Sequence, residues 1–389
     1  MGKNRKLFLT DYCLTPHVNI PNAGILCEGG KIIGIGGVSA FSQDEPGLET
    51  IDATSCYALP GLIDSHIHGG GGFDTERVLE PDMHMQDLSR YLASKGVTSF
   101  LPTLVTMPRE QMIRTVARLT EMMSEPMPGA APCGLHLEGP FINPVKAGSQ
   151  SKEDCSPVDC GFFDELLAAA NGRIKLLTFA PELKNAEKLV EIMLDNGVIP
   201  SMGHTMAGVD ETLRIIDAGA RRCTHLFNGL PPLHHRDTSI TDVVLTHDEV
   251  SVEVILDGAH IDPRMVDITA RVKPNDKLIG VSNSIQFPGK QSKGLYEKDG
   301  RIYNEEGVIA GTEMTLDGGW MHLRSYSHMP GNLAAACFTC NPAADLGLIT
   351  RGELSPGKRA DITFFDSETN QVVMTVSNGV TVFNAMDSK

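Results

Sequence analysis

Histidine and glutamate side chains that could bind a metal ion stand at the ends of apolar segments of this chain. His66 and His68 are separated by one residue. Every second side chain of a strand points to the same side, so both imidazoles can reach one ion. Imidazole and carboxylate together suit Zn²⁺ or another divalent transition ion such as Fe²⁺. Such an ion lowers the pKa of bound water and polarises a carbonyl, which is chemistry for hydrolysing an amide. The further candidate ligands are Glu138, His204 and His225.

Two arrangements of these candidate ligands are open. Two ions fit if Glu138 bridges them, whereas a simpler arrangement is one ion held by Glu138, His204 and His225 together with water. His204 and His225 each close an apolar segment, where a histidine that is satisfied within the core is the alternative. The shared position of all these residues at strand ends favours the metal centre.

The middle of the chain must bring these residues together, and it alternates strand patterns with helical patterns. Eight strands separated mostly by helices predict a (β/α)8 TIM-like barrel, in which the carboxyl ends of all strands meet at one mouth. A doubly wound open sheet has the same local pattern, but polar residues at so many strand ends favour the barrel. The predicted strands are 61–68, 98–105, 133–138, 174–180, 198–204, 222–228, 252–257 and 277–282, and the helical patterns include 83–94, 111–123, 186–195, 210–217 and 264–271.

Both ends of the chain consist of short β-like runs separated by turns. Because chain termini often lie close together, we expect one small composite β-sandwich domain from residues 1–60 and 352–389, with the barrel between them at 61–351. Separate terminal sheets are the alternative. The runs are 6–10, 23–27, 31–35, 360–365, 372–376 and 380–384, with a hairpin turn expected at Glu28-Gly29-Gly30.

Composition narrows the class of partner. The net charge of −16 argues against nucleic acid and anionic membrane surfaces, although histidine and arginine can still make one pocket attractive to a small anion. No apolar segment follows the basic start or approaches membrane-spanning length, which predicts a cytoplasmic protein. The nine cysteines are irregularly spaced and are expected to be reduced thiols.

Several motifs make the chain similar to a known family. Taken together they resemble the N-acetylglucosamine-6-phosphate deacetylases of the amidohydrolase superfamily, and LHLEGP is the sharpest of them. Dihydroorotase-like and hydantoinase-like members of the superfamily mostly bridge their metals with a carboxylated lysine, and Glu138 argues against those. The motifs are GLIDSHIH at 61–68, LHLEGPF at 135–141, GHT at 203–205, THLFN at 224–228, DGAH at 257–260, AGT at 310–312, NPA at 341–343 and LSPGKRAD at 354–361.

The resemblance implies a metal-dependent barrel, usually in a homodimer, that removes acetate from an N-acetylamino sugar phosphate. It implies that Glu138, His204 and His225 carry the metal, with His66 and His68 available for a second ion. Arg236 and His260 match residues that hold the sugar phosphate, in the family partly across the dimer interface, and a guanidinium suits phosphate. The remaining residues matched to substrate binding are Ser149, Gln150, Asn228, Gly229, Asp257, Ala310 and Gly311.

Two positions depart from the family pattern. Asn283 stands where the family has the catalytic aspartate that takes a proton from metal-bound water and returns it to the departing amine. An amide side chain can orient water but cannot accept a proton near neutral pH. Gln150 replaces a histidine on the substrate side, which leaves the sugar open, with the galactosamine epimer as an alternative.

Asn283 therefore predicts a chain that binds its substrate and turns it over very slowly. An engineered aspartate-to-asparagine exchange, made to trap a bound ligand, is the favoured explanation, because the rest of the site is retained and the exchange is nearly isosteric. Natural drift towards a sugar-phosphate-binding pseudoenzyme is the rival, and Gln150 supports it.

Overall fold

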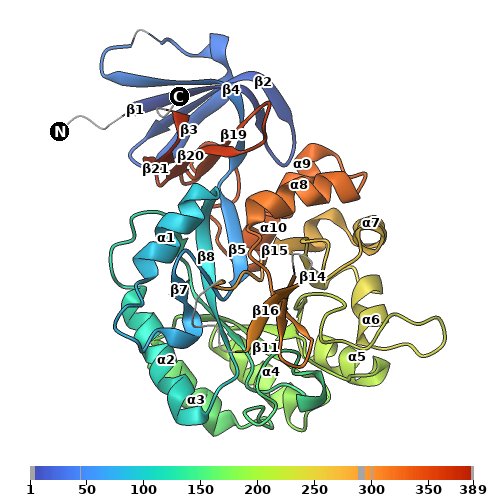
Figure 1. Ribbon diagram of the computed structural model, residues 1–389. Helices are drawn as coiled ribbons and strands as arrows, with labels where there is room; N and C mark the ends of the chain where they lie inside the picture. The colour runs from blue at the N-terminus through green and yellow to red at the C-terminus, as the bar shows by residue number, and fades with distance from the viewer. Residues whose placement is uncertain (1–4, 44, 288–293, 299–300, 387–389) are drawn as a thin grey trace.

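The computed structural model describes residues 5–43, 45–287, 294–298 and 301–386. A barrel surrounded by helices carries a β-sheet at one end, to which both chain termini contribute (Figure 1). None of the helices in these described ranges is both long and apolar enough to cross a membrane.

The barrel consists of eight strands that pair in parallel in the order β15-β14-β13-β12-β11-β10-β8-β5. Hydrogen bonds from the segment after β15 bring the last strand back to the first, since Asn283 N donates to His66 O at 2.9 Å and His68 N donates to Ser284 O at 2.8 Å. The predicted TIM-like barrel is therefore confirmed. Its strands are β5 (Leu62–Ile67), β8 (Val97–Val105), β10 (Leu135–Glu138), β11 (Ile174–Phe179), β12 (Ile199–Met202), β13 (Arg222–Cys223), β14 (Ser251–Ile255) and β15 (Leu278–Val281).

Several predicted strands are too long at their carboxyl ends, and two of them stop at a left-handed turn. The prediction extended them through His204 and Asn228, whereas β12 ends at Met202 and β13 at Cys223. The reason is a left-handed backbone at His204 (φ 47°), His225 (φ 24°) and Phe227 (φ 75°), which cannot continue a strand. Apolar periodicity does not reveal such a turn, and these are the points where the chain redirects two candidate ligands.

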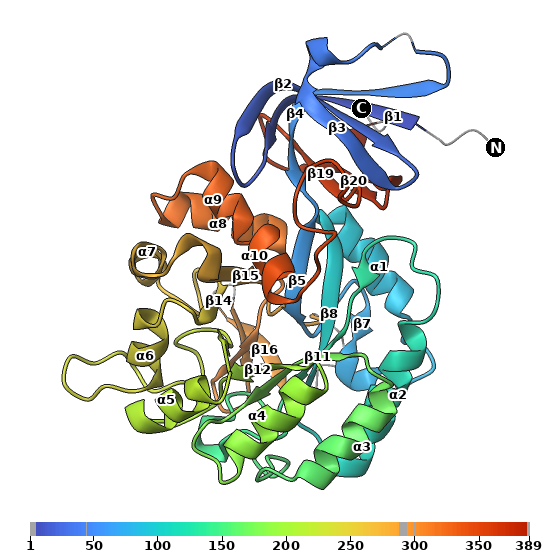
Figure 2. The same ribbon diagram turned by 180° about the vertical axis from the view of Figure 1, so that it is seen from behind.

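Helices surround the barrel on its outer side, as the two opposite views show (Figures 1 and 2). The five predicted helical patterns correspond to α1, α2, α4, α5 and α7, each with ends close to the predicted ones. The full set is α1 (Met85–Ser94), α2 (Arg109–Met122), α3 (Cys160–Ala170), α4 (Ala186–Asp195), α5 (Val209–Asp217), α6 (Ile240–Thr246), α7 (Pro263–Val272), α8 (Leu316–Tyr326), α9 (Gly331–Ala336) and α10 (Cys340–Asp345), with 3₁₀ turns η1 (Val38–Ala40), η2 (Thr75–Arg77), η3 (Pro144–Lys146) and η4 (Asn275–Lys277).

The terminal strands join into one continuous mixed sheet in the order β21-β20-β19-β4-β1-β2-β3, which confirms a composite β domain and rules out separate terminal sheets. Its core contains Phe8, Ile25 and Phe364, contributed by both ends of the chain. Gly29 and Gly30 form the expected turn with positive φ values of 57° and 80°. The strands are β1 (Arg5–Leu14), β2 (Asn19–Glu28), β3 (Lys31–Gly37), β4 (Leu48–Pro60), β19 (Ile362–Asp366), β20 (Val372–Ser377) and β21 (Val380–Asn384).

Strand β4 connects this sheet to the barrel with almost no linker, because it ends at Pro60 and β5 begins at Leu62. Between them, Gly61 N donates to Asp361 O at 2.9 Å, and a Cβ at Gly61 would come within 2.2 Å of Thr98 Oγ1. The close packing explains a glycine here and fixes the start of the strand that carries His66 and His68.

Short strands complete the mouth and flanks of the barrel. A three-stranded antiparallel sheet, β16 (Leu295–Lys298), β17 (Arg301–Asn304) and β18 (Ile309–Gly311), follows β15 and borders the pocket at the mouth. The remaining strands are β6 (Gly69–Gly70), β7 (Phe73–Asp74) and β9 (Ala131–Pro132).

Candidate metal centre

The five predicted ligands converge on the carboxylate of Glu138, at the mouth end of β10. Its Oε1 lies 2.9 Å from His225 Nε2, 3.1 Å from His204 Nε2 and 3.3 Å from His66 Nε2. Its Oε2 lies 3.7 Å from His68 Nε2. Two three-residue groups with metal-binding geometry result, one of His66, His68 and Glu138 and the other of Glu138, His204 and His225. Glu138 is common to both, as the two-ion arrangement requires.

Hydrogen bonds to the far side of two imidazoles fix which nitrogen faces the cluster. His204 Nδ1 donates to the backbone oxygen of Lys146 at 2.7 Å, so Nε2 is the nitrogen turned towards Glu138. His66 Nδ1 donates to Glu253 Oε2 at 2.9 Å, and its buried Nε2 makes no hydrogen bond. Both imidazoles are thus oriented as metal ligands usually are, by a partner on the opposite nitrogen.

The donor set fits a divalent cation. His204 Nε2 and His225 Nε2 face each other at 3.0 Å beside Glu138 Oε1, an arrangement that needs a shared proton or a cation among the three atoms. All five side chains are buried, so water does not solvate these atoms freely. A buried group of imidazoles and one carboxylate matches the preference of Zn²⁺ and similar ions.

Burial and neighbouring charges shift the pKa values of His66, His68 and Glu138 in different directions. Burial alone would lower the pKa of His66, but the carboxylates of Glu138 and Glu253 raise it to about 10. Burial lowers the pKa of His68 to about 4, because it outweighs the attraction of Glu138. Burial would raise the pKa of Glu138, yet the facing histidines, His66 foremost, hold it well below its usual range.

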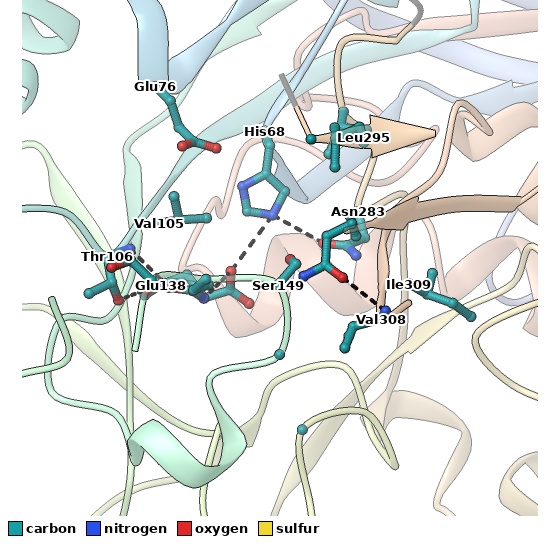
Figure 3. A pocket seen from close by; sticks show the side chains of 18 of the residues that line it. His68, Glu76, Val105, Thr106, Glu138, Ser149, Asn283, Leu295, Val308 and Ile309 are labelled. Atoms are coloured by element: carbon teal, nitrogen blue, oxygen red, sulfur yellow. Dashed lines mark hydrogen bonds and ion pairs between the residues drawn. The ribbon is translucent and has the colours of Figure 1, made fainter. Parts of the chain in front are cut away.

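Asn283 contacts this group directly. Its Oδ1 accepts a hydrogen bond from His68 Nε2 at 3.1 Å, and its backbone is left-handed with φ 51°, a conformation that asparagine and aspartate tolerate best among non-glycine residues. Figure 3 shows the side chains of Asn283, His68 and Glu138 turned towards one another. The predicted position of the proton-transfer group is therefore next to the candidate metal ligands.

Gln150 is also in contact with the ligands. Its Oε1 accepts from Thr106 N at 2.9 Å, which directs its Nε2 to donate to Glu138 Oε2 at 2.9 Å, with His204 Nε2 at 3.4 Å. Gln150 was expected on the substrate side of the site. It lines the pocket, but its amide is committed to a ligand carboxylate.

The group lies at the base of a pocket of about 1040 Å³ at the barrel mouth. The walls come from the segment around η2, the loop at 148–154 and the sheet β16–β18 (Figure 3). The predicted site residues that line it are His68, Glu138, Ser149, Gln150, His204, His225, Asn228, Gly229, His260, Asn283 and Ala310.

Four predicted site residues do not line this pocket. His66 lies beneath it in the barrel interior, and Gly311 is the buried neighbour of Ala310. Asp257 Oδ2 accepts from His260 Nδ1 at 2.7 Å, so it holds a wall residue in place from behind. Arg236 is exposed on the loop before α6, outside the pocket of its own chain.

Sequence reasoning missed two carboxylates. Glu76 lines the pocket beside His68 in Figure 3, and enclosure by the walls, with Asp74 and Glu138 nearby, raises its pKa to about 7. Glu253 lies on β14 beneath the ligands. The sequence contains an indication of its importance, because it is a charged residue within an otherwise apolar strand. His136, two residues before Glu138 on β10, hydrogen-bonds Thr103 and Thr178 within the barrel and belongs to neither ligand group.

Known proteins share sequence and architecture with this chain. The model of the Amidohydrolase family matches residues 57–382. An N-acetylglucosamine-6-phosphate deacetylase of Bacillus subtilis (strain 168) is 32% identical over 384 residues, which cover 95% of each chain.

Solved structures show the same architecture. The N-acetylglucosamine-6-phosphate deacetylase of Thermotoga maritima superposes with a TM-score of 0.84 at 30% identity and covers 97% of this chain and 99% of its own. A mutant of the Mycobacterium smegmatis enzyme in complex with N-acetyl-D-glucosamine-6-phosphate superposes with a TM-score of 0.88 at 24% identity, covering 98% and 100%, which supports the fold. The chain belongs to the amidohydrolase family and, within it, to the N-acetylglucosamine-6-phosphate deacetylases.

Proposed function

We propose that this chain binds N-acetylglucosamine 6-phosphate at a divalent metal centre and has the site of a deacetylase that releases acetate and glucosamine 6-phosphate. The observation that carries the proposal is the convergence of His66, His68, His204 and His225 on Glu138 at the base of the pocket. In this site Asn283 replaces the group that moves protons, so we expect binding with very slow turnover.

Glu138, His204 and His225 would hold one ion, most suitably Zn²⁺ with Fe²⁺ as an alternative, and His66 and His68 would complete a second site with Glu138. The ion, when bound, polarises the acetamide carbonyl and acidifies water. The chain's own residues fix the geometry, because Lys146 and Glu253 each accept a hydrogen bond from the far side of a ligand histidine.

Asn283 determines what the site cannot do. Amide hydrolysis needs a group that accepts a proton from water and then gives one to the departing amine. Asn283 Oδ1 already accepts the hydrogen of His68 Nε2, and its amide nitrogen has no lone pair available for a proton near neutral pH. The residue can therefore orient water or the acetamide, and both proton transfers are left without a carboxylate.

The sugar phosphate would be held by the pocket walls. His260 is fixed through Nδ1 by Asp257, which leaves Nε2 as the nitrogen that can face a phosphate. The remaining contacts proposed are from Ser149, Gln150, Asn228, Gly229, Ala310 and Gly311. Because Arg236 is exposed outside its own pocket, we propose that it reaches the phosphate in a partner subunit of a homodimer.

The same proposal extends to the setting of the protein. We place it in the cytoplasm, acting on a small molecule and not on nucleic acid or membrane, in keeping with its net charge of −16. We assign residues 1–60 and 352–389 to the small domain and 61–351 to the barrel.

A second candidate function is a sugar-phosphate sensor that binds without turnover. It is favoured by the second amide, since Gln150 as well as Asn283 hydrogen-bonds a candidate metal ligand. Drift away from catalysis would change both positions, whereas a single engineered exchange would leave position 150 alone.

The test of binding is calorimetry on the metal-loaded protein with N-acetylglucosamine 6-phosphate, its galactosamine epimer and unphosphorylated N-acetylglucosamine. We expect the first to bind most tightly and acetate release to be slow. Equal affinity for the phosphorylated and unphosphorylated sugars would contradict the proposed substrate class, and preference for the epimer would reassign the sugar.

A further inference from the structure

Glu253 is a fully buried carboxylate that belongs to neither group of candidate ligands and does not line the pocket. It lies on β14 and faces the ligand cluster from the barrel interior. Its Oε2 accepts two hydrogen bonds, from His66 Nδ1 at 2.9 Å and from the backbone nitrogen of His225 at 3.2 Å. One oxygen atom thus contacts a ligand from each of the two proposed ion sites.

The other oxygen of Glu253 is held by an equally buried guanidinium. Arg222 Nε and Nη2 donate to Oε1 at 3.0 Å and 2.7 Å. Arg222 is itself anchored, because Nη2 also donates to Ser65 Oγ at 2.6 Å and Nη1 pairs with Asp345 of α10. Both guanidinium nitrogens donate to Oε1, and this charged contact on one side leaves Oε2 turned towards the histidines.

Stability alone is a weak reason for this arrangement. Burying a carboxylate and a guanidinium costs desolvation free energy, and a buried ion pair can often be replaced by apolar side chains at no loss of stability. A pair in the centre of a barrel, with one oxygen directed at two histidines, indicates a role in positioning them.

The backbone at His225 needs such support. Its φ of 24° is outside the favoured regions for a residue with a Cβ, and Phe227 nearby is also left-handed at 75°. Glu253 holds this turn twice, through Oε2 to the nitrogen of His225 and through its own backbone oxygen, which accepts from Leu226 N at 2.8 Å. The turn directs His225 Nε2 to Glu138.

We infer that Glu253, locked by Arg222, is the positioning residue that keeps His66 and His225 in their metal-binding orientations and so determines how tightly the cluster retains its ions. This inference rests on the proposed role of the two histidines as metal ligands. Glu253 touches neither substrate nor reacting atoms, and it acts through the histidines.

Glu253→Gln tests the inference with almost no change of shape. The amide has one acceptor oxygen, whereas Glu253 accepts donors on both oxygens. If the amide oxygen faces Arg222, the NH₂ group faces His66 Nδ1–H and the backbone N–H of His225, which places donor against donor. The imidazole then relieves the clash by moving its proton to Nε2, and that nitrogen can no longer bind an ion.

The measurement is metal content per chain after dialysis, followed by chelator competition and the visible spectrum of the Co²⁺-loaded protein. Loss of a partner behind a ligand typically weakens metal binding by about 10–100-fold, and we expect this loss together with an altered Co²⁺ spectrum. Unchanged metal content, affinity and spectrum in folded Glu253→Gln protein would overturn the inference.

A triple variant separates positioning from folding. Arg222→Met, Glu253→Leu and Asp345→Leu together remove the buried guanidinium and both carboxylates paired with it, so no buried charge is left without a partner, yet His66 Nδ1 loses its acceptor. We expect the same 10–100-fold weakening there. The matched control is Lys273→Met, which removes another buried charge. The ammonium group of Lys273 donates to the backbone oxygens of Val244 and His247, so its loss should leave metal binding unchanged.

The outcomes distinguish this inference from the proposed function. If the unmodified chain binds no divalent ion, the proposed metal centre fails and the inference fails with it. If the unmodified chain binds ions and both variants at Glu253 bind them equally well, only the inference fails. An effect of Lys273→Met as large as that of Glu253→Gln would also overturn it, because general destabilisation would then explain the loss.

Discussion

Replacing Asn283 with aspartate tests the proposal that the site lacks a proton acceptor. Asparagine and aspartate have the same number of heavy atoms. Residue 283 is only 8% exposed, and its left-handed backbone with φ 51° suits both residues. The exchange therefore needs no repacking. It replaces the amide next to His68 with a carboxylate that can accept a proton, at a position in direct contact with the ligand group.

Proton transfer by a positioned group contributes about 10²–10⁴-fold to the rate. This range corresponds to roughly 3–5 kcal/mol of transition-state stabilisation, at 1.36 kcal/mol for each tenfold step. We expect Asn283→Asp to raise kcat for acetate release from N-acetylglucosamine 6-phosphate by that factor. The change should be mainly in kcat, because the substrate contacts in the pocket walls are unaltered.

The assay is acetate release by metal-loaded protein, with metal content measured on the same samples. Asn283→Ala is the control, since it removes the amide without supplying a base and should stay as slow as the unmodified chain. If Asn283→Asp keeps its metal and binds the sugar phosphate but gains no more than a few-fold in rate, the missing proton acceptor is not what limits turnover. That result would favour the sensor.

Three further predictions concern the phosphate, acid stability and a buried lysine. Arg236→Ala should weaken the binding of N-acetylglucosamine 6-phosphate at least tenfold and leave the binding of the unphosphorylated sugar unchanged, as measured by calorimetry. Equal effects on both affinities would refute the phosphate assignment. The ion pair with Arg222 holds the pKa of Glu253 well below its usual range despite burial, so its stabilising effect is present above the unfolded carboxyl value of about 4.3 and is lost as the pH falls. Urea unfolding of protein freed of metal by a chelator measures this effect. Between pH 7 and pH 3 the free energy of unfolding should fall more steeply in the unmodified chain than in Glu253→Gln, and parallel curves for the two proteins would contradict this. Lys273→Met should lower the free energy of unfolding by about 1–3 kcal/mol, because two carbonyl oxygens at the end of α6 lose a charged donor, and the urea midpoint measures it.

The barrel and the convergence of the candidate metal ligands could be predicted because they depend on patterns that the sequence displays. Apolar runs of strand length separated by helical periods predict the alternation, and the carboxyl ends of parallel strands must meet. His66 and His68 follow from the period of two along a strand. Glu138 follows from its place at the end of another strand.

What the sequence concealed depends on single backbone angles and on distant partners. The left-handed turns at His204 and His225 shortened the predicted strands, and no periodicity reports a positive φ at one residue. Gln150 lines the pocket, but no sequence pattern indicates that Thr106 N fixes its oxygen and turns its NH₂ towards Glu138. The pairing of residues 44 positions apart is a tertiary fact that local patterns do not contain.

The two amides have unequal consequences for the metal centre. Asn283 Oδ1 accepts a hydrogen bond from His68 Nε2, and it therefore competes with a second ion for that nitrogen. Gln150 donates to Glu138 Oε2, the carboxylate oxygen that faces His68. The contact of Asn283 falls on the half of the cluster formed by His66, His68 and Glu138, whereas Gln150 Nε2 also lies 3.4 Å from His204 Nε2 in the other half. The half formed by Glu138 Oε1, His204 and His225 keeps its mutual contacts near 3 Å, and the backbone oxygen of Lys146 fixes the imidazole of His204. Asn283, which we propose stands in place of the proton-transfer group, thus leaves the one-ion arrangement intact, and for this reason we expect this chain to lose catalysis well before it loses its metal or its ligand.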